Sequence, residues 1–276
     1  MLRTIQGVIF LILFLPEGFT LSGQTLVSAR IMDSLSHQPM EFVNVGLPGK
    51  GLGTVSNEKG EFSLLVPDSL KNEILKISII GYRSLSIPLT DIKQASTIVL
   101  APVSVELQEV VVNPRKLKIK TLGNSTRSAM VTGGFKDNRL GAEMAVKMNI
   151  SHKNTQIRKV CLNVVENSLG ENPIFRINVY RKNQDGLPGE NILRQNIIVE
   201  PKNKTGLIEV DLKPYFIFCD EDVYIAFEWI KDLGDVKSLY FSLKLVGEGM
   251  CYRQTSQASW EKISAIGVGI YAEVGY

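Results

Sequence analysis

Histidines and cysteines, the side chains most often used for acid–base and metal chemistry, are scarce in this sequence. There are two histidines, His37 and His152, and three cysteines. A zinc carboxypeptidase holds its metal with a His-x-x-Glu pair and a distant histidine, but Met40 and Thr155 stand at the third position after the two histidines. A serine hydrolase often places its nucleophile on a Gly-x-Ser-x-Gly turn, and the sequence contains no such turn. The residues therefore predict no catalytic site, and we expect a protein that is not an enzyme.

Acidic side chains offer two other chemistries. Asp220 and Asp222 belong to the densest acidic run, and carboxylates in sandwich loops can bind calcium; the alternative is a solvated turn and no cofactor. Paired carboxylates could also serve a glycosidase. Asp222 and Glu228, however, would lie about 20 Å apart along one strand, too far for that reaction. A hydrolase with a carboxylate-based site in the second domain stays open as an alternative function, without a named pair.

The three cysteines, Cys161, Cys219 and Cys251, all lie in the second half of the chain. Export would permit one disulfide with one thiol left over. Three unpaired, buried thiols are the other arrangement that the sequence allows. Metal binding through these cysteines is not expected, because their spacings are wide.

The two tryptophans differ in their surroundings. Trp229 alternates with Phe227 along an apolar strand, which predicts a core position. Trp260 stands among polar residues, and a flat exposed ring could stack on a sugar. We therefore take Trp260, Gln257 and Tyr252 as candidate ligand-binding residues. The competing interpretation is a core tryptophan at the edge of a strand.

The first 23 residues have the pattern of a secretory signal peptide. A positive charge at Arg3 precedes the apolar run 8–15, and small residues follow at Ser22 and Gly23. This order is typical of a cleaved export signal, and the run is shorter than the ~20 apolar residues of a membrane-spanning helix. The alternative is a buried N-terminal helix. We interpret residues 1–23 as a signal peptide, and no later segment is long and apolar enough to be a transmembrane span.

The composition is that of a globular protein. The chain has 276 residues, 44% of them hydrophobic, which is enough for two domains with their own cores. The 31 basic and 28 acidic residues give a net charge of +3, too even a balance to imply nucleic acid as a partner. Together with the signal peptide, this predicts an exported protein of the periplasm, the outer-membrane periphery or the cell surface.

Apolar residues alternate with a period of two in two series of short segments. The first series runs from Thr25 to Val112 and the second from Ala142 to the end of the chain. Period-two segments separated by turn residues are typical of antiparallel sandwiches. We predict an all-β protein of two antiparallel β-sandwich domains, a small one at residues 24–112 and a larger, jelly-roll-like one at residues 135–276.

Residues 113–134 are interpreted as a basic linker between the two domains. They contain the basic run Arg115–Lys120 followed by the small polar stretch Gly123–Thr126. Such a run could contact an anionic lipid or glycan. It could equally be a solvated connection with no partner.

Several short motifs occur in order in the first domain. They are Asp33–Val45, the turn Gly53–Phe62, the corner Ser78–Tyr82 and the closing segment Leu107–Val112. In this order they resemble the carboxypeptidase regulatory-like domain, a small transthyretin-like sandwich common in exported proteins of the Bacteroidetes. The second domain resembles β-sandwich domains of unassigned role that follow this module.

The motif residues have structural roles that the sequence explains. Asn57 can accept hydrogen bonds from its own backbone two residues on, and Gly60 can adopt a positive φ, so that the pair makes a tight turn. Phe62 then returns the chain to the core. Gly81 permits a close backbone approach, and Tyr82 can pack its ring with the hydroxyl at the rim.

The resemblance implies an accessory or structural role, since the family's domain has no catalytic residues to carry over. In receptors of that phylum the same module precedes a plug and a barrel, for which too few residues remain here. We therefore expect an exported, non-catalytic accessory or binding protein of the cell envelope, with a glycan or another envelope protein as its partner. A hydrolase and a purely structural adaptor are the alternatives.

The signal peptide predicts a defined mature N-terminus. N-terminal sequencing of the protein isolated from envelope fractions should give Gly23 or Gln24 as the first residue, because small residues follow the apolar run only there. Recovery of Met1 in those fractions would contradict the assignment.

Overall fold

A computed structural model of the chain describes residues 23–103, 117–135, 139–168, 172–232, 234 and 239–276. Residues 1–22 of the predicted signal peptide, the closing motif Leu107–Val112 and the start of the basic run lie outside the described residues. Within the described part of the chain, regular structure consists of strands and a few short 3-10 turns. No helix there is long and apolar enough to cross a membrane.

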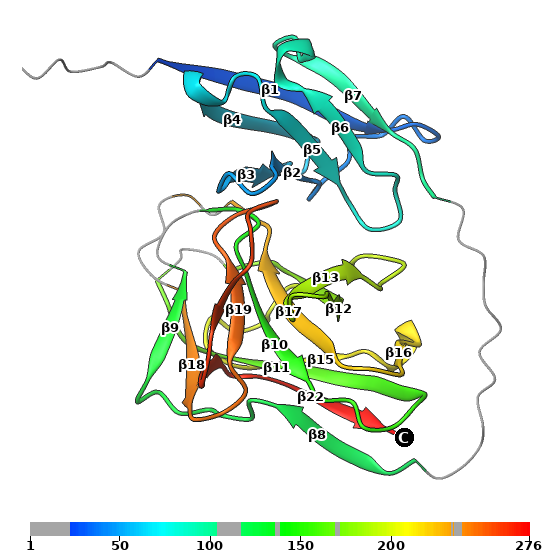
Figure 1. Cartoon of the computed structure of the whole chain (residues 1–276), viewed down its shortest axis with the longest axis vertical. Coiled ribbons are helices and arrows are strands. Elements are labelled where there is room, and N and C mark those ends of the chain that lie inside the picture. The colour runs from blue at the N-terminus through cyan, green and yellow to red at the C-terminus, as the bar shows by residue number, and fades with distance from the viewer. Residues whose placement is uncertain (1–22, 104–116, 136–138, 169–171, 233, 235–238) are drawn as a thin grey trace, which may run out of the picture.

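The first domain is a sandwich of two small sheets, with strand orders β4-β1-β7 and β3-β2-β5-β6 (Figure 1). Alternate apolar residues of both sheets face a common core, in which Ile31, Val45 and Ile77 are fully buried. The pairing is antiparallel except between β1 and β7, which run parallel. The elements are β1 (Gln24–Asp33), β2 (Asn44–Leu47), β3 (Leu52–Val55), β4 (Glu61–Pro67), η1 (Asp68–Leu70), β5 (Ile74–Ser78), β6 (Leu85–Pro88), η2 (Leu89–Asp91) and β7 (Ser96–Leu100).

The second domain is a larger sandwich. Its seven-stranded sheet has the order β13-β12-β17-β10-β19-β20 with β14 on β12, and its eight-stranded sheet has the order β21-β18-β11-β22-β8 with β15, β16 and β9 attached. The elements are β8 (Ile119–Gly123), β9 (Thr132–Phe135), β10 (Glu143–Met148), β11 (Thr155–Asn167), β12 (Phe175–Lys182), β13 (Pro188–Asn191), β14 (Ile197–Val199), β15 (Gly206–Asp211), η3 (Lys213–Tyr215), β16 (Phe218–Cys219), β17 (Val223–Trp229), β18 (Leu239–Leu245), β19 (Met250–Arg253), β20 (Glu261–Ile263), β21 (Ile266–Val268) and β22 (Ile270–Gly275).

The core of the second domain lies between these two sheets. It is rich in aromatic and branched side chains, and Trp229 is fully buried there, as its alternation predicted. The predicted all-β, two-sandwich fold is therefore what the structure shows.

The predicted linker is shorter than expected. Strands β8 and β9 both lie inside residues 113–134 or overlap their end, and they pair with β22 and β18. Only Leu122 of β8 packs against the core, while Lys120 and Ile119 are exposed on this edge strand. Charged residues are common on edge strands. Because they interrupt the apolar alternation, this strand was not predicted from the sequence. The second sandwich therefore begins by Ile119, not at residue 135.

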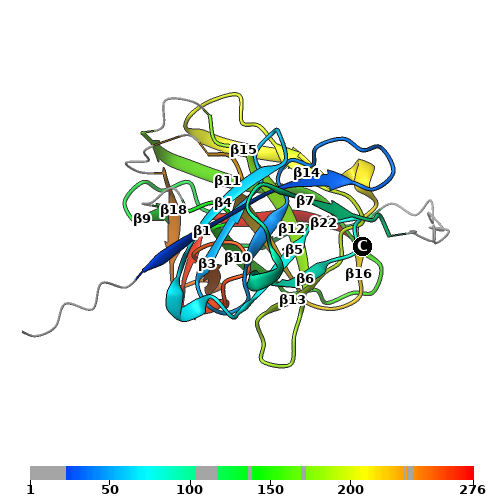
Figure 2. The same ribbon diagram turned by 90° about the horizontal axis from the view of Figure 1, so that it is seen from above.

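The two domains are in direct contact. Seen in Figures 1 and 2, the first domain lies over the second, with β2 and β3 facing it. The loop Thr255–Gln257 of the second domain approaches the β2–β3 hairpin so closely that a Cβ on Gly53 would overlap the Ser256 carbonyl oxygen, and one on Gly46 would lie 2.6 Å from it. The Thr255 hydroxyl donates to the Gly53 carbonyl oxygen over 2.7 Å. Glycine is thus required on the hairpin for the backbones to approach.

The corner motif of the first domain is held by a partly buried polar contact. The Tyr82 hydroxyl donates to Asp33 Oδ2 over 2.5 Å, and the backbone N–H groups of Leu35 and Ser36 donate to Asp33 Oδ1. The Tyr82 hydrogen bond, with these backbone bonds, lowers the pKa of Asp33 to about 2.

This contact predicts an acid-sensitive contribution to stability. The unfolded chain binds a proton at Asp33 near its ordinary pKa of 3.8, whereas the folded chain does so only near 2. The contribution is therefore complete above about pH 4 and is lost as the pH falls toward 2. In urea unfolding followed by circular dichroism, Tyr82→Phe should lower the midpoint at pH 7, and the gap to wild type should narrow between pH 4 and 2. A gap that does not depend on pH would contradict this account, and Tyr215→Phe is the matched control.

Candidate functional site: a cleft between the domains

A group of charged and polar side chains lies on the outer face of the seven-stranded sheet, under the first domain. Along strands β10, β12, β17 and β19 the side chains point alternately to the two faces of the sheet. Residues such as Phe227 point into the core, and their neighbours along the strand point outward. In this register Glu143 stands opposite both Glu228 and Arg253, and Arg176 stands opposite Glu228. Both glutamates are fully buried, and Arg176 is 1% exposed. We call these four residues, with Asn178 and Tyr180, the buried charge network.

The buried charge network is held by short polar contacts. Arg253 Nη2 lies 2.6 Å from Glu143 Oε2, and Arg176 Nη1 lies 3.4 Å from Glu228 Oε2. Asn178 Nδ2 donates to Glu143 Oε1 over 2.7 Å and to Glu228 Oε2 over 2.9 Å. The Tyr180 hydroxyl donates to Glu143 Oε1 over 2.9 Å. Two guanidinium groups thus balance two carboxylates.

Burial and charge act in opposite directions on these groups. Burial raises the pKa of Glu143, the Arg253 guanidinium works against that rise, and the Glu228 carboxylate adds to it. Burial, with the Glu143 charge, also raises the pKa of Tyr180 well above its ordinary value, so that its hydroxyl is a permanent donor. Burial opposes the charge on Arg253, but the two carboxylates outweigh it and raise its pKa.

The network also joins the domains. Arg176 Nη2 donates to the backbone carbonyl oxygen of Phe42 in the first domain. Beside this bond, Phe42 and Val55 pack with Ile174 and Ile230 of the second domain in a separate small core. The orientation of the first domain is therefore fixed partly by a buried guanidinium of the second.

A cleft of about 590 Å³ lies above the network. The corner Ser78–Ser84 of the first domain lines one wall, and Gly189–Arg194 of the second lines the other. Its floor contains Arg176, Tyr180 and Arg253. At the corner, a Cβ on Gly81 would lie 3.5 Å from the Arg194 carbonyl oxygen, so the two walls come close there. The Ser78–Tyr82 motif of the first domain therefore faces the second domain.

The candidate ligand-binding residues predicted from sequence do not form one site. Trp260 is half-buried, with its ring edge-on to Tyr180 at 5.6 Å and the Arg253 guanidinium 5.0 Å from its centroid. Gln257 belongs to the domain contact, where its Nε2 donates to Ser78 Oγ over 2.9 Å. Tyr252 packs partly against the core on the other face of the sheet, and its hydroxyl donates to Glu261. The structure therefore does not bring these three together as a stacking platform.

The candidate calcium ligands have other partners. Asp220 Oδ1 accepts the Asn154 N–H over 2.7 Å, and Asp222 Oδ1 accepts the Ile150 N–H over 3.0 Å. Lys147 Nζ lies 3.8 Å from Asp222 Oδ2. Among the described residues, no group of three or more His, Cys, Asp or Glu side chains could hold a metal ion.

The turn residues and cysteines lie away from the cleft. Asn57 Oδ1 accepts the N–H groups of Lys59 and Glu61, both over 2.9 Å, Gly60 has a φ of +73°, and Phe62 is buried in the core. The three cysteines are buried and unpaired, so of the two arrangements that the sequence allowed the structure shows free thiols.

The buried charge network was not predicted from the sequence. Each of its four strands carries one or two charged residues at outward positions, which is an ordinary pattern in any single strand. Only the strand register brings Glu143, Glu228 and the two arginines together. A charged residue inside an otherwise apolar strand, as at Glu228 between Phe227 and Trp229, was the one available indication.

Among known protein families, one matches the first domain. Residues 27–112 match the family model described as CarboxypepD_reg-like domain. No curated protein matches the sequence.

Solved structures show only a distant likeness. A structure of the infectious bursal disease virus Gx strain is 9% identical with a TM-score of 0.31, over 95% of this chain and 61% of that one. The VP2 subviral particle of the same virus is 9% identical with a TM-score of 0.29, over 91% of this chain and 64% of that one. The chain thus spans less than two thirds of either structure, and at these TM-scores the likeness carries no inference.

The buried charge network predicts that the free energy of unfolding depends strongly on the balance between its carboxylates and guanidinium groups. Arg176→Leu leaves the Glu228 carboxylate buried without the nearer of its two arginine partners, and removing one partner of a buried ion pair typically costs about 3–5 kcal/mol. The double variant Arg176→Leu with Glu228→Leu removes both charges and should recover a large part of that loss in urea unfolding. Arg30→Leu, which breaks an exposed ion pair with Glu61, is the control and should cost far less. A double variant no more stable than Arg176→Leu alone would show that the two charges are not coupled.

Proposed function

Residues 27–112 form a carboxypeptidase regulatory-like domain, and from that premise we propose that the chain is a non-catalytic binding protein exported to the cell envelope. The binding site is the cleft between the regulatory-like domain and the second sandwich. The observation that carries the proposal is the position of the buried charge network, whose Arg176, Tyr180 and Arg253 form the floor of this cleft and whose Arg176 also bonds the first domain. Rigid concave sites between domains are common places for ligands.

A hydroxyl-rich ligand such as a glycan fits the cleft better than a flat protein surface. Its volume of about 590 Å³ lies in the usual range for small-molecule sites. Ile79, Ile80 and Leu193 supply apolar surface on its walls, while Asn44 and Lys76 supply polar groups. This mixture suits the apolar faces and hydroxyl groups of a sugar. Export and location in the periplasm, at the outer membrane or on the cell surface are part of the proposal and rest on the N-terminal sequence pattern.

The hydrolase alternative has a carboxylate pair to consider, since Asn178 Nδ2 bonds both Glu143 and Glu228. Both carboxylates are fully buried, and neither lines the cleft. A catalytic carboxylate must reach the atom to which it transfers a proton. The geometry therefore supports a structural role for this pair, and binding is the better-supported function. The adaptor alternative differs in needing no small ligand in the cleft.

The proposal predicts glycan binding that is lost when the cleft is filled. Ile80 is a half-buried wall residue, so Ile80→Trp should occupy the cleft and reduce binding on a glycan array at least tenfold. Leu65→Trp is the matched control, because Leu65 is a 50%-exposed residue on the sheet of the first domain that faces away from the cleft. Two outcomes would contradict the cleft as the glycan site. One is undiminished glycan binding by both Ile80→Trp and Leu65→Trp, and the other is the absence of glycan binding by wild type and Leu65→Trp alike.

Trp260→Ala separates the cleft from the Trp260 stacking site expected from sequence. Loss of glycan binding in this variant but not in Ile80→Trp would place the sugar on Trp260 instead. Melting curves of all three variants establish that each remains folded.

A further inference from the structure

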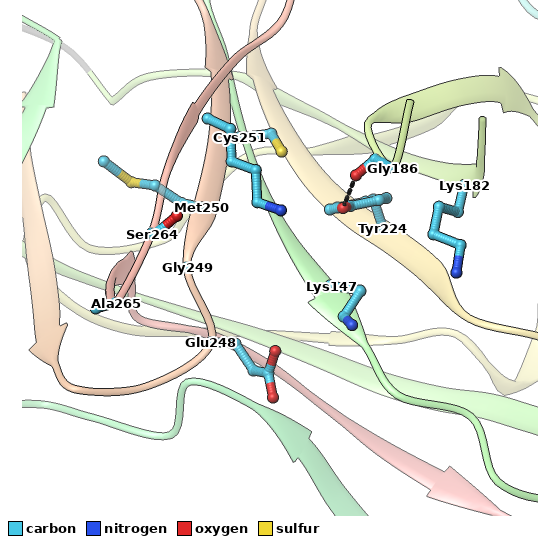
Figure 3. A pocket seen from close by; sticks show the side chains of 11 residues that line it. Lys147, Lys182, Gly186, Tyr224, Glu248, Gly249, Met250, Cys251, Ser264 and Ala265 are labelled. Atoms are coloured by element: carbon cyan, nitrogen blue, oxygen red, sulfur yellow. Dashed lines mark hydrogen bonds between the residues drawn. The ribbon is translucent and has the colours of Figure 1, made fainter. Parts of the chain in front are cut away.

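A second, smaller pocket lies on the same sheet face, beyond the first domain. It has a volume of about 330 Å³, and Figure 3 shows it with Lys147 and Lys182 near Tyr224. Lys147 is on β10 and Lys182 on β12, the two strands that flank the strand of Tyr224, β17. Three lysines line it, with Tyr224 and Cys251 among the other lining residues. We call it the lysine pocket.

The strand register places these side chains on one face. Lys147 of β10 stands opposite Tyr224 of β17, and Lys262 of β20 stands opposite Cys251 of β19. The neighbours of these residues along the strands, such as Met148, point into the core. Tyr224 and Cys251 are 3% and 1% exposed, so they form a solid base, while Lys262 is exposed at the mouth.

Two constrained turns form the sides of the lysine pocket. On one side the Tyr224 hydroxyl donates to the Gly186 carbonyl oxygen over 2.5 Å, which fixes the turn after Lys182. On the other side a Cβ on Gly249 would overlap the Ile263 carbonyl oxygen. Ala265, beside it, has a φ of +68°, a conformation that is costly for a residue with a side chain and is often kept at binding sites. The pocket is thus preformed.

The charges around the lysine pocket do not cancel. Asp222 Oδ2 lies 3.8 Å from Lys147 Nζ and 4.0 Å from Lys182 Nζ, so this carboxylate serves those two lysines. Glu248, the one carboxylate among the lining residues, accepts a hydrogen bond from Asn149 Nδ2 on Oε1. The ammonium group of Lys262 makes no ion pair or hydrogen bond with any residue that the structure describes. Three ammonium groups thus meet two carboxylates, and the excess positive charge is at Lys262.

We propose that the lysine pocket binds an oxyanion group, a phosphate, sulfate or carboxylate carried on a small polar ligand, with Lys262 as its main contact and Lys147 beside it. The base of the pocket stays uncharged, which leaves the lysines to set its potential: burial raises the pKa of Tyr224 to about 12 and also raises the pKa of the Cys251 thiol. Glu248 opposes the anion and limits its affinity. This site is separate from the cleft between the domains and does not depend on glycan binding there.

Isothermal titration calorimetry of the full chain at low ionic strength tests the proposal. The probes are inorganic phosphate, sulfate and glucuronate, with glucose as the neutral control, and the order of affinity identifies the kind of oxyanion. At least one oxyanion should bind and glucose should not bind in this pocket. Lys262→Glu should weaken oxyanion binding tenfold or more, whereas Lys93→Glu, at an exposed lysine of the first domain, should leave it unchanged. Added sodium chloride should weaken binding.

A second variant is expected to strengthen oxyanion binding rather than weaken it. Glu248→Gln removes the opposing carboxylate and should tighten oxyanion binding severalfold, an effect that misfolding would not produce. Absence of binding by all three oxyanions, equal binding by wild type and Lys262→Glu, or no tightening in Glu248→Gln would each overturn the proposal.

Discussion

The buried balance of charge between Glu143, Glu228, Arg176 and Arg253 is the constraint on which the rest of the molecule depends. Charges removed from water are tolerated only when each is paired and hydrogen-bonded, so all four must be present and correctly placed. Their placement requires the register of four neighbouring strands and the cover of the first domain. The seven-stranded sheet and the position of the first domain on it are therefore parts of one electrostatic arrangement.

The contact between the domains combines this charge arrangement with a close backbone approach. Gly46 and Gly53 stand opposite each other in the β2–β3 hairpin and leave room for the Ser256 carbonyl. A glycine pair gives no side-chain contacts of its own, so its contribution is the close backbone approach, beside which the Thr255 hydroxyl bonds the Gly53 carbonyl oxygen. These contacts join the two domains that supply the walls of the cleft.

The sequence was sufficient for features that depend on neighbours along the chain. Period-two alternation predicted the two sandwiches, and the ordered motifs predicted the domain that residues 27–112 match. Features that depend on neighbours across strands were not accessible: Trp260 has polar neighbours in sequence, but its ring is covered by Tyr180 and Arg253. Strand β8 was not predicted because it is an edge strand with charged residues in which three of five residues are exposed and none is fully buried. The buried charge network was not predicted for the same reason as the surroundings of Trp260, because its members become neighbours only across strands.

The pairing of strands also determines when each domain can be completed as the chain is made. In the first domain β1 pairs with β7, its last described strand, and in the second β8 pairs with β22, which ends at Gly275. Each sandwich is therefore closed by joining strands from its beginning and its end. Contacts of such long sequence separation slow folding, and until they form, β1 and β8 present unpaired edges that can join other chains. A chain that stops short of β22 leaves the second sandwich open beside β8 and β11, so even a small C-terminal deletion is expected to favour aggregation over a smaller folded protein.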